Sequence, residues 1–373
     1  FFEDHMSKEI TNVGIIGVGQ IGKVHLEGYL SMPNAKVTAI AGRDPQKTES
    51  VANQYNIPYW TTDFRALLDK TEIQGVSVCL HNNLHMPVTI AALIAGKHVI
   101  SEKPIAGSYR DGARMIEVAK QEKKQLSVQI ADLFSRETKA AMMAIENGWL
   151  GTPYLAHSSG FRRRGRPYVD GYGTPSFVQK ASASGGALFD MGIYHIANVL
   201  YLLGNPMPQR ISGRTFQRTE MDATRRTISN FDVEEVAVGL INLENDIALS
   251  LIETWAMHLD MLEGSYITGT DGGIRLSPFG LFRSLADMDI DATTNLDGFD
   301  YRIHNVRENG EAYDSPLAHF IAAAQGRVPL IPTAEIALNT MLISEGIYLS
   351  QKLGREITAT EVIETSISSS QEV

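Results

Sequence analysis

The sequence has a single cysteine, Cys79, among its 373 residues, so no disulfide can form within the chain. One cysteine fits a reducing compartment, where disulfides are rare. Cys79 lies in the apolar run from Val76 to Leu80, and we interpret it as a small buried hydrophobic residue rather than a reactive thiol. This cysteine usage favours a cytoplasmic location.

Long apolar runs and an excess of positive charge are also missing. No stretch approaches the roughly 20 consecutive apolar residues that a membrane-spanning helix needs. Residues 1–5 lack the pattern of an export signal, so we expect Met6 to be the native start. The 33 Lys and Arg residues are outnumbered by 43 Asp and Glu residues, which gives a net charge of −10. Because nucleic-acid binding needs a basic face, we expect neither a nucleic-acid nor a membrane partner. No metal site is predicted.

The length and composition predict a globular protein with two domains. A chain of 373 residues exceeds one ordinary core, and 43% hydrophobic with 20% charged residues is typical of globular proteins. We expect a dinucleotide-binding domain at residues 6–128, a substrate-binding and oligomerisation domain at 129–363, and a flexible tail at 364–373.

A glycine-rich turn follows the first apolar segment. Residues 13–16 predict a buried strand and residues 23–32 a helix, with a G-x-G-x-x-G pattern between them. The first glycine permits a tight turn, the second allows a pyrophosphate to approach the backbone, and the third lets helix and strand pack closely. The helix N-terminus then offers N–H groups to the phosphates. The pattern predicts a dinucleotide site formed by Gly17, Gly19, Gln20, Ile21 and Gly22.

Strand and helix patterns alternate through the rest of the first third. Such repeated units with apolar strands predict a parallel, doubly wound sheet. The predicted strands are 36–41, 75–80, 98–101 and 125–130, and the predicted helices are 46–55, 64–69, 87–95 and 111–122.

The second half follows a different pattern, in which long strands alternate with short turns. This pattern predicts an antiparallel sheet, with strands at 153–159, 233–243, 247–255 and 265–270. The loop 161–172 is rich in arginine and tyrosine and is either a substrate loop or a solvated basic loop. Residues 281–312 are predicted to be irregular. The fold class is therefore α/β.

The end of the second strand bears on the choice of cofactor. An acidic residue there would bond the ribose of NAD, whereas an arginine can accept the 2′-phosphate of NADP. Gly42 occupies the expected position of the acid, Arg43 follows it, and Asp44 is one residue further on. Gly42 and Arg43 favour NADP, while Asp44 could still serve NAD.

Two later segments carry acid, base and lysine candidates. Lys103 follows a strand that ends near residue 101, and ligands in open α/β sheets lie beyond the carboxyl ends of strands. Its ammonium can stabilise a developing alkoxide, although on position alone a solvated surface lysine is the favoured interpretation. In the predicted helix 185–203, Asp190 and Tyr194 are four residues apart and share a face, whereas His195 diverges from Asp190. Tyrosine or histidine could accept the proton of an alcohol. Alternatively, these polar groups satisfy one another inside the protein.

Four segments together resemble the Gfo/Idh/MocA family, named after glucose–fructose oxidoreductase, inositol dehydrogenase and a rhizopine-catabolism protein. The resemblance covers nearly the whole chain, and the run Glu102-Lys103-Pro104 in this context is specific. The segments are the turn 17–22, the stretch 82–104, the helix 185–198 and the stretch 347–355.

The resemblance implies an N-terminal Rossmann domain and a C-terminal α/β domain with a large, mostly antiparallel open sheet. It implies hydride transfer between NAD or NADP and a sugar, polyol or sugar-derived carbonyl compound. It also implies self-association through the open sheet, into a dimer or tetramer.

The resemblance further assigns residues. It puts Lys103 beside the reacting oxygen and Asp190 in the substrate pocket. Many members have histidine four residues after that aspartate, where this chain has Tyr194 with His195 next to it, and we favour Tyr194 as the acid/base. The implied cofactor-binding residues are Gly17, Gly19, Gln20, Ile21, Gly22, Gly42, Arg43, Asn82, His85, Glu102 and Lys103.

Two other functions compete with a dehydrogenase. One is a redox-neutral, glycoside-cleaving enzyme that keeps its cofactor, as some relatives do, with the Tyr194–His195 pair supplying a base. The other is a non-catalytic nicotinamide sensor, which the presence of Lys103 and Asp190 argues against.

Overall fold

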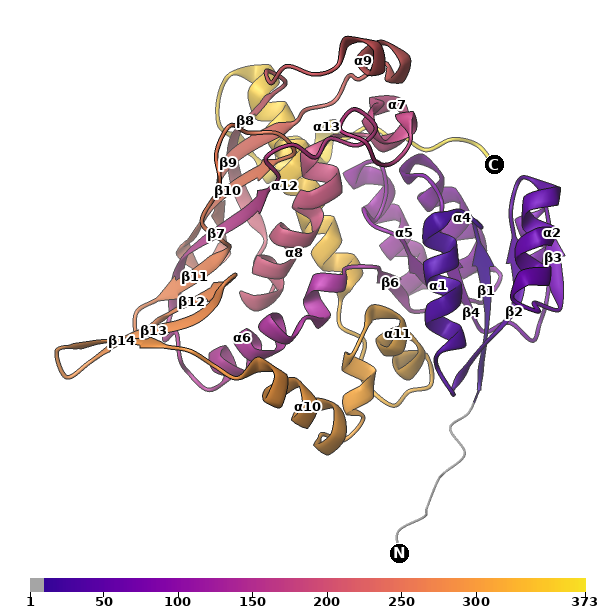
Figure 1. The fold of residues 1–373 in the computed structure, drawn as a ribbon, viewed down its shortest axis with the longest axis horizontal. Coiled ribbons are helices and arrows are strands. Elements are labelled where there is room, and N and C mark those ends of the chain that lie inside the picture. The colour runs from indigo at the N-terminus through magenta and orange to yellow at the C-terminus, as the bar shows by residue number, and fades with distance from the viewer. Residues whose placement is uncertain (1–9) are drawn as a thin grey trace, which may run out of the picture.

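Two β-sheets and the helices packed on them make up the protein, as seen in a computed structural model that describes residues 10–373. The expected start at Met6 lies outside the described residues. Figure 1 shows the early part of the chain on one side and the second sheet on the other, with a layer of helices between them. Among residues 10–373, no helix is both long and apolar enough to span a membrane.

The first sheet has six strands in the order β3-β2-β1-β4-β5-β6, and every pairing is parallel. The predicted doubly wound sheet is therefore confirmed. The strand order reverses between β1 and β4, which is where open α/β sheets bind their ligands. Its strands are β1 (Thr11–Ile16), β2 (Ala35–Ala41), β3 (Tyr59–Thr61), β4 (Gly75–Val78), β5 (His98–Ser101) and β6 (Leu126–Val128).

The helices of this half begin at residues with capping side chains. Asp44 accepts a hydrogen bond from the backbone N–H of Lys47 at the start of α2, and Ser108 does the same for Asp111 at the start of α5. These helices are α1 (Gln20–Leu30), α2 (Pro45–Gln54), α3 (Phe64–Leu68), α4 (Asn82–Ile94) and α5 (Tyr109–Gln121).

Helix α4 begins five residues before the predicted start at Pro87, so Pro87 lies inside the helix. Proline has no N–H to donate to the carbonyl four residues earlier, which belongs to Asn83. That carbonyl instead accepts a hydrogen bond of 3.0 Å from the backbone N–H of Gln371. The late chain thus satisfies a group that proline leaves without its helical partner.

Gln371 belongs to the stretch that we expected to be a flexible tail. After α13 (Ala359–Thr365), this stretch runs along the first domain. The backbone N–H of Ser369 donates to the carboxylate of Asp111 at 2.9 Å, and the Ser366 hydroxyl accepts from the N–H of Arg110 at 3.1 Å. These contacts differ from the expectation of a free tail.

The second sheet has nine strands in the order β14-β13-β12-β11-β7-β10-β9-β8-β15. Only β7 and β10 pair in parallel, so the predicted mostly antiparallel sheet is confirmed. Its strands are β7 (Pro153–Phe161), β8 (Pro208–Phe216), β9 (Val236–Leu243), β10 (Ile247–Thr254), β11 (Tyr266–Gly269), β12 (Gly273–Leu276), β13 (Phe279–Leu285), β14 (Met288–Ala292) and β15 (Ile357–Thr358).

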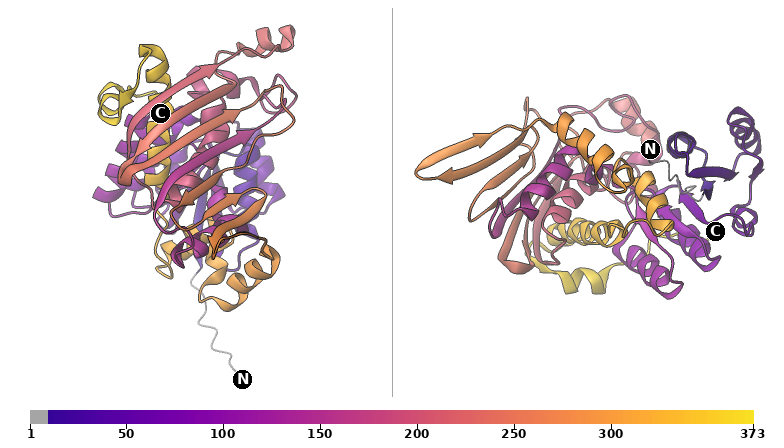
Figure 2. Two further views of the ribbon diagram at one scale, coloured as in Figure 1. Left: turned by 90° about the vertical axis from the view of Figure 1, so that its left-hand side faces the viewer. Right: turned by 90° about the horizontal axis from the view of Figure 1, so that it is seen from below.

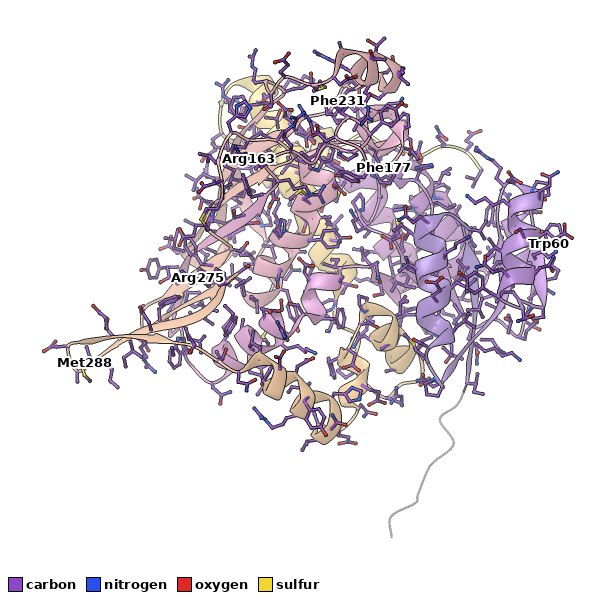
Figure 3. The ribbon with its side chains drawn as sticks, viewed as in Figure 1. Trp60, Arg163, Phe177, Phe231, Arg275 and Met288 are labelled. Carbon is purple, nitrogen blue, oxygen red and sulfur yellow. The ribbon has the colours of Figure 1, made fainter. Side chains whose placement is uncertain are left out.

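The segment predicted to be irregular, 281–312, is largely regular. Strands β13 and β14 form a hairpin, and α10 (Leu296–Val306) follows it. The hairpin projects from the body of the protein with Met288 at its tip (Figure 3). Most of its end is exposed on both faces, so it lacks the alternation of apolar and polar residues that identifies a strand from sequence.

Helices cover one face of the second sheet. These are α6 (Arg136–Glu146), α8 (Ile193–Leu202) and the long α12 (Thr333–Leu353). Figure 2 shows the strands uncovered on the opposite face. The helices therefore form the layer that separates the two sheets.

A late helix, α11 (Pro316–Ala324), completes the core of the first domain. Its Leu317, Phe320 and Ile321 are buried in one apolar cluster with Val13 of β1 and Ile40 of β2. The domain boundaries expected from the sequence placed this helix in the second domain, at residues 129–363. The first core is thus built from two distant parts of the chain.

Replacing Phe320 by alanine tests this arrangement. Phe320 is fully buried, so Phe320→Ala should lower the free energy of unfolding by about 3–5 kcal/mol. Urea unfolding followed by circular dichroism measures the loss. Phe177, which is 45% exposed and labelled in Figure 3, provides the control Phe177→Ala, which should cost far less. A loss below about 1 kcal/mol for Phe320→Ala would show that α11 is not part of the core.

Candidate active site

The glycine turn lies between β1 and α1 and has little room for side chains. A Cβ at Gly22 would lie 1.8 Å from the carbonyl oxygen of Gly17, and Gly17 itself has a φ of +104°. A Cβ at Gly19, by contrast, would meet nothing within 4 Å. Gly17 and Gly22 are therefore required for close packing, while the backbone of Gly19 faces open space. This geometry fits a pyrophosphate at the turn.

A groove of about 320 Å³ adjoins the turn. It is lined by Gly17, Gly19, Gly42, Arg43 and Asp44, among others. Gln20 and Ile21 lie in the first turn of α1 with their side chains exposed. The groove therefore contains the predicted nucleotide-binding turn and the end of β2.

An acidic residue in place of Gly42, at the end of β2, would be crowded by neighbouring side chains. A Cβ at Gly42 would lie 2.5 Å from the hydroxyl of Thr48 and 2.6 Å from a methyl group of Val18. Asp44 already accepts a hydrogen bond from the N–H of Lys47, as the cap of α2. Arg43 is exposed at the groove.

Glu102 follows β5 and fixes the loop that carries Lys103. One carboxylate oxygen lies 2.9 Å from Nε2 of His25 on α1, and the other accepts from the backbone N–H of Lys103 at 3.1 Å. Burial works against the charge on Glu102, but the contacts with His25 and Lys103 lower its pKa. Glu102 is thus an ionised support between α1 and the loop.

His85 and Asn82, predicted to contact the cofactor, are engaged elsewhere. His85 is fully buried, and its ring nitrogens lie 2.8 Å from the carbonyl oxygen of Pro104 and 3.0 Å from that of Leu80. Burial lowers its pKa. The Asn82 amide donates to the carbonyl of Ala183 at 2.8 Å. For His85 the prediction is therefore corrected: its ring braces two loops and does not face the groove.

Lys103 meets Asp190 across the interface between the two domains. Its Nζ donates to the Asp190 carboxylate at 3.1 Å and to the Asp190 carbonyl at 2.9 Å. The same nitrogen lies 4.7 Å from the ring centroid of Tyr194. Burial disfavours the charge on Lys103, but Asp190 and then Tyr194 raise its pKa. The ammonium group is therefore protonated and oriented, rather than solvated at the surface.

The helix that carries Asp190 begins with a π-helical turn, η3 (Leu188–Gly192), before α8. Such wide turns occur frequently at functional sites. The buried carboxylate of Glu234 accepts hydrogen bonds from the backbone N–H groups of Gly186 and Leu188, which fixes the start of this segment.

Two side chains of the segment formed by η3 and α8 contact residues at the end of strand β10. The indole N–H of Trp255, just after the strand, donates to the Asp190 carboxylate at 3.0 Å. Two residues earlier, Glu253 lies 2.9 Å from Nδ1 of His195. Asp190 and His195 therefore both face β10. The prediction that they diverge is wrong, because it assumed regular α-helical spacing through the π-helical turn.

Burial and its partners set the charge of each acid and base. Burial works against the Asp190 carboxylate, but Lys103, Arg162 and Trp255 lower its pKa. Burial raises the pKa of Tyr194 despite the opposing charge of Lys103. For His195, burial is outweighed by Glu253 and Asp132, so its pKa is raised. Asp132 is partly buried nearby, and desolvation raises its own pKa.

The arginine-rich loop divides into two roles. Arg162 reaches the Asp190 carboxylate at 3.4 Å and also contacts the hydroxyl of Tyr172. Arg166 is fully buried and forms ion pairs with Asp170 and Glu235. The loop is therefore anchored by Arg166, and only Arg162 of these two points to the candidate site.

Sequence reasoning missed Glu253, although a signal was present. The inward residues of β10 are Ile247, Leu249, Leu251 and Glu253, so a carboxylate ends an otherwise apolar row. A buried charge in such a row requires a partner. Asp132 and His25 had no comparable signal.

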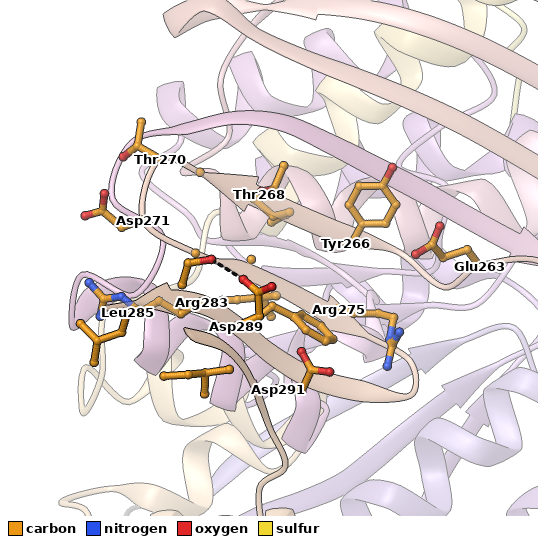
Figure 4. Close-up of a pocket in the computed structure, with 18 residues that line it drawn as sticks. Glu263, Tyr266, Thr268, Thr270, Asp271, Arg275, Arg283, Leu285, Asp289 and Asp291 are labelled. Carbon is orange, nitrogen blue, oxygen red and sulfur yellow. Dashed lines mark hydrogen bonds between the residues drawn. The ribbon is translucent and has the colours of Figure 1, made fainter. Parts of the chain in front are cut away.

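A larger cavity than the groove at the glycine turn lies elsewhere, on strands β11–β14 of the second sheet (Figure 4). It has a volume of about 970 Å³ and is lined by charged residues that include Glu263, Arg275 and Asp289. None of the predicted site residues lines it. Cavity size therefore does not identify the candidate site in this protein.

Two models of known protein families match this chain. A family model described as "Oxidoreductase family, NAD-binding Rossmann fold" matches residues 11–130. A second, described as "GFO/IDH/MocA C-terminal domain", matches residues 138–275. The two models thus divide the chain in the same order as its two sheets.

Individual proteins that are similar to this chain share only a minority of its residues. D-glucoside 3-dehydrogenase of Escherichia coli is 29% identical over 68% of this chain and 73% of its own length. Levoglucosan dehydrogenase of Pseudarthrobacter phenanthrenivorans is 31% identical over 52% of this chain, which matches about half (51%) of that protein. A solved levoglucosan dehydrogenase, in complex with NADH and levoglucosan, has a TM-score of 0.75 at 22% identity and covers 94% of this chain and all (100%) of its own.

The pairing of Lys103 with Asp190 can be tested without knowing the substrate. In the variant Asp190→Asn the pKa of Lys103 should fall, because the carboxylate charge is the main influence that raises it. Competitive acetylation across a pH series, read by mass spectrometry, measures this titration. The control Glu345→Gln removes a partly buried carboxylate on α12 that has no contact with Lys103, and the titration of Lys103 should stay unchanged. An unchanged titration in Asp190→Asn would contradict the pairing.

Proposed function

The chain belongs to the Gfo/Idh/MocA family of NAD-binding Rossmann oxidoreductases, and on that premise we propose that it transfers a hydride between NAD or NADP and a secondary hydroxyl of a sugar or polyol. One observation carries the proposal. The Lys103 ammonium is held by Asp190 and Tyr194 at the carboxyl end of β5, on the sheet edge that also carries the glycine turn. Sugar dehydrogenases among the relatives support the substrate class.

Each residue of the candidate site then has its own role in the reaction. Lys103 donates a hydrogen bond to the substrate oxygen and stabilises negative charge there as the hydroxyl proton leaves. Asp190 keeps the ammonium charged and oriented, and Trp255 holds Asp190. Tyr194 or His195 exchanges the proton. The nicotinamide ring, when bound, supplies the hydride acceptor.

We extend the proposal to the assembly. The uncovered face of the second sheet carries Leu240 and Phe216, which are 54% and 40% exposed. A second copy of the chain would bury them, in a dimer or tetramer.

The variant Lys103→Ala tests the role of the ammonium. Turnover should fall by about 10²–10³-fold, because one charge-stabilising donor is lost from a site that excludes water. Fluorescence titration with NADH and NADPH should show nearly unchanged cofactor binding. Lys120→Ala, at a lysine 70% exposed, is the matched control and should retain turnover. Retained turnover in Lys103→Ala would overturn the mechanism.

The same assay identifies the reaction. A panel of glucosides, inositols and aldoses is incubated with NAD or NADP while reduced nicotinamide is followed optically and products are analysed. Reduced cofactor formed in step with a keto or lactone product supports a dehydrogenase. Cleaved glycoside with no net change in cofactor would replace the proposal by the redox-neutral, cofactor-retaining reaction.

We also propose that Arg43 favours NADP, because the position expected for the acid that selects NAD is occupied by Gly42, where a side chain would be crowded, and Arg43 is exposed at the groove. Arg43→Ala should raise KM for NADP about ten- to hundredfold, the effect of one charge-assisted hydrogen bond, and change KM for NAD little. Arg110→Ala, on the exposed side of α5, is the control. If neither KM changes, this assignment is wrong.

A further inference from the structure

Glu253, the hydrogen-bond partner of His195, has no role in the mechanism above, yet it lies beside the reacting groups. Glu253 is fully buried at the end of β10. One oxygen of its carboxylate lies 2.9 Å from Nδ1 of His195, and the other accepts from the Ser158 hydroxyl at 3.3 Å. An ionised carboxylate in such a place needs a partner that can carry positive charge.

The surrounding backbone leaves room for this pair. Gly160 of β7 is the register partner of Glu253 in β10. A Cβ at Gly160 would lie 2.0 Å from the Glu253 carboxylate and 2.4 Å from Nδ1 of His195. Gly192, at the end of the π-helical turn, would bring a Cβ to 3.2 Å from Glu253. Glycines on both sides thus make the contact possible.

The contact fixes the protons of the imidazole. With the carboxylate accepting from Nδ1–H, a neutral His195 has its lone pair on Nε2. Within the described chain, Nε2 has no hydrogen-bond partner, and 27% of the side chain is exposed. His195 can therefore accept a proton from a molecule in the site, in the way that a buried carboxylate orients a catalytic histidine.

Tyr194 is less suited to the same task. Its ring face, rather than its hydroxyl, contacts the Lys103 ammonium at 4.7 Å from the centroid. Burial keeps the phenol protonated by raising its pKa. A base for alcohol oxidation must be free of its proton before the reaction.

We propose that Glu253 is a positioning residue that orients His195, so that Nε2 of His195, and not Tyr194, exchanges the proton of the substrate hydroxyl. In oxidation, the O–H bond of the substrate breaks, its proton moves to Nε2, and the hydride leaves its carbon for the nicotinamide. The reduction reverses each transfer. This inference rests on the proposed function.

The charge on His195 depends on groups from several elements. Glu253 faces it from β10, Asp132 from the turn before α6, and Arg162 from the loop after β7. Burial opposes protonation most strongly, the two acids favour it, and Arg162 opposes it, with a net rise in pKa. On its own helix, α8, Tyr194 directly precedes it. His157, on the other face of the sheet, is influenced by Glu253.

The variant Glu253→Gln removes the charge and keeps the shape, and its amide oxygen can still accept from Nδ1–H. The pKa of His195 should then fall. Oxidation requires neutral His195, so the acidic limb of kcat/KM should lie above the ordinary histidine value of about 6.5 in the wild type and shift to lower pH in the variant. The plateau of kcat should also fall, while KM for the substrate changes little.

Two comparisons separate this role from a structural one. His195→Asn should lower kcat about 10²–10⁴-fold, whereas Tyr194→Phe should retain kcat to within about tenfold. Glu345→Gln removes another partly buried carboxylate, on α12, that does not contact His195, so the acidic limb of that variant should stay in place. An unmoved limb in Glu253→Gln, or the larger loss in Tyr194→Phe, would overturn the inference.

A readout without substrate keeps the two proposals distinct. NMR titration of the His195 ring, assigned by comparison with His195→Asn, should give a lower pKa in Glu253→Gln than in the wild type. An equal pKa in both proteins overturns the role of Glu253 whatever the reaction is. A wild-type protein that oxidises none of the panel, but shows the expected titration, contradicts the proposed function instead.

Discussion

The contact between Lys103 and Asp190 is the interaction on which the site depends. Lys103 comes from the loop after β5 of the first sheet, and Asp190 from the π-helical turn that packs on the second. Removing two charges from water costs free energy, so such a pair contributes little to stability. It does fix how the two domains meet, because the ammonium has both the carboxylate and the carbonyl of Asp190 as acceptors.

Strand β10 supports this contact from behind. Trp255 and Glu253 point to the same side of the strand and reach Asp190 and His195 on one helical segment. The strand lies in the middle of the nine-stranded sheet, between β7 and β9, so it is held on both edges. A rigid central strand is a precise support for acid and base groups, whereas a loop would leave them less well defined.

The residues that could be predicted from the sequence are those whose role follows from local spacing. The glycine turn and Lys103 after a strand belong to this class, whereas the π-helical turn at Asp190 could not be foreseen from regular helical spacing. Glu253, Asp132 and His25 act through partners far away in the chain, which periodicity cannot reveal. His85 was assigned to the cofactor because it lies in a family-like segment, but burial turned its ring toward two carbonyls. The start of α4 was misplaced because Pro87 is normally a helix-starting residue, and the chain that compensates for it comes nearly 300 residues later.

The position of α11 has a consequence for how the protein is made. Leu317, Phe320 and Ile321 fill the core that begins with Val13. During synthesis from the N-terminus, the six-stranded sheet emerges from the ribosome long before this helix exists. The part of the core that α11 completes therefore stays open until residue 324 has been translated. A gene fragment that ends at the last strand of the first sheet would encode a domain with this part of its core exposed.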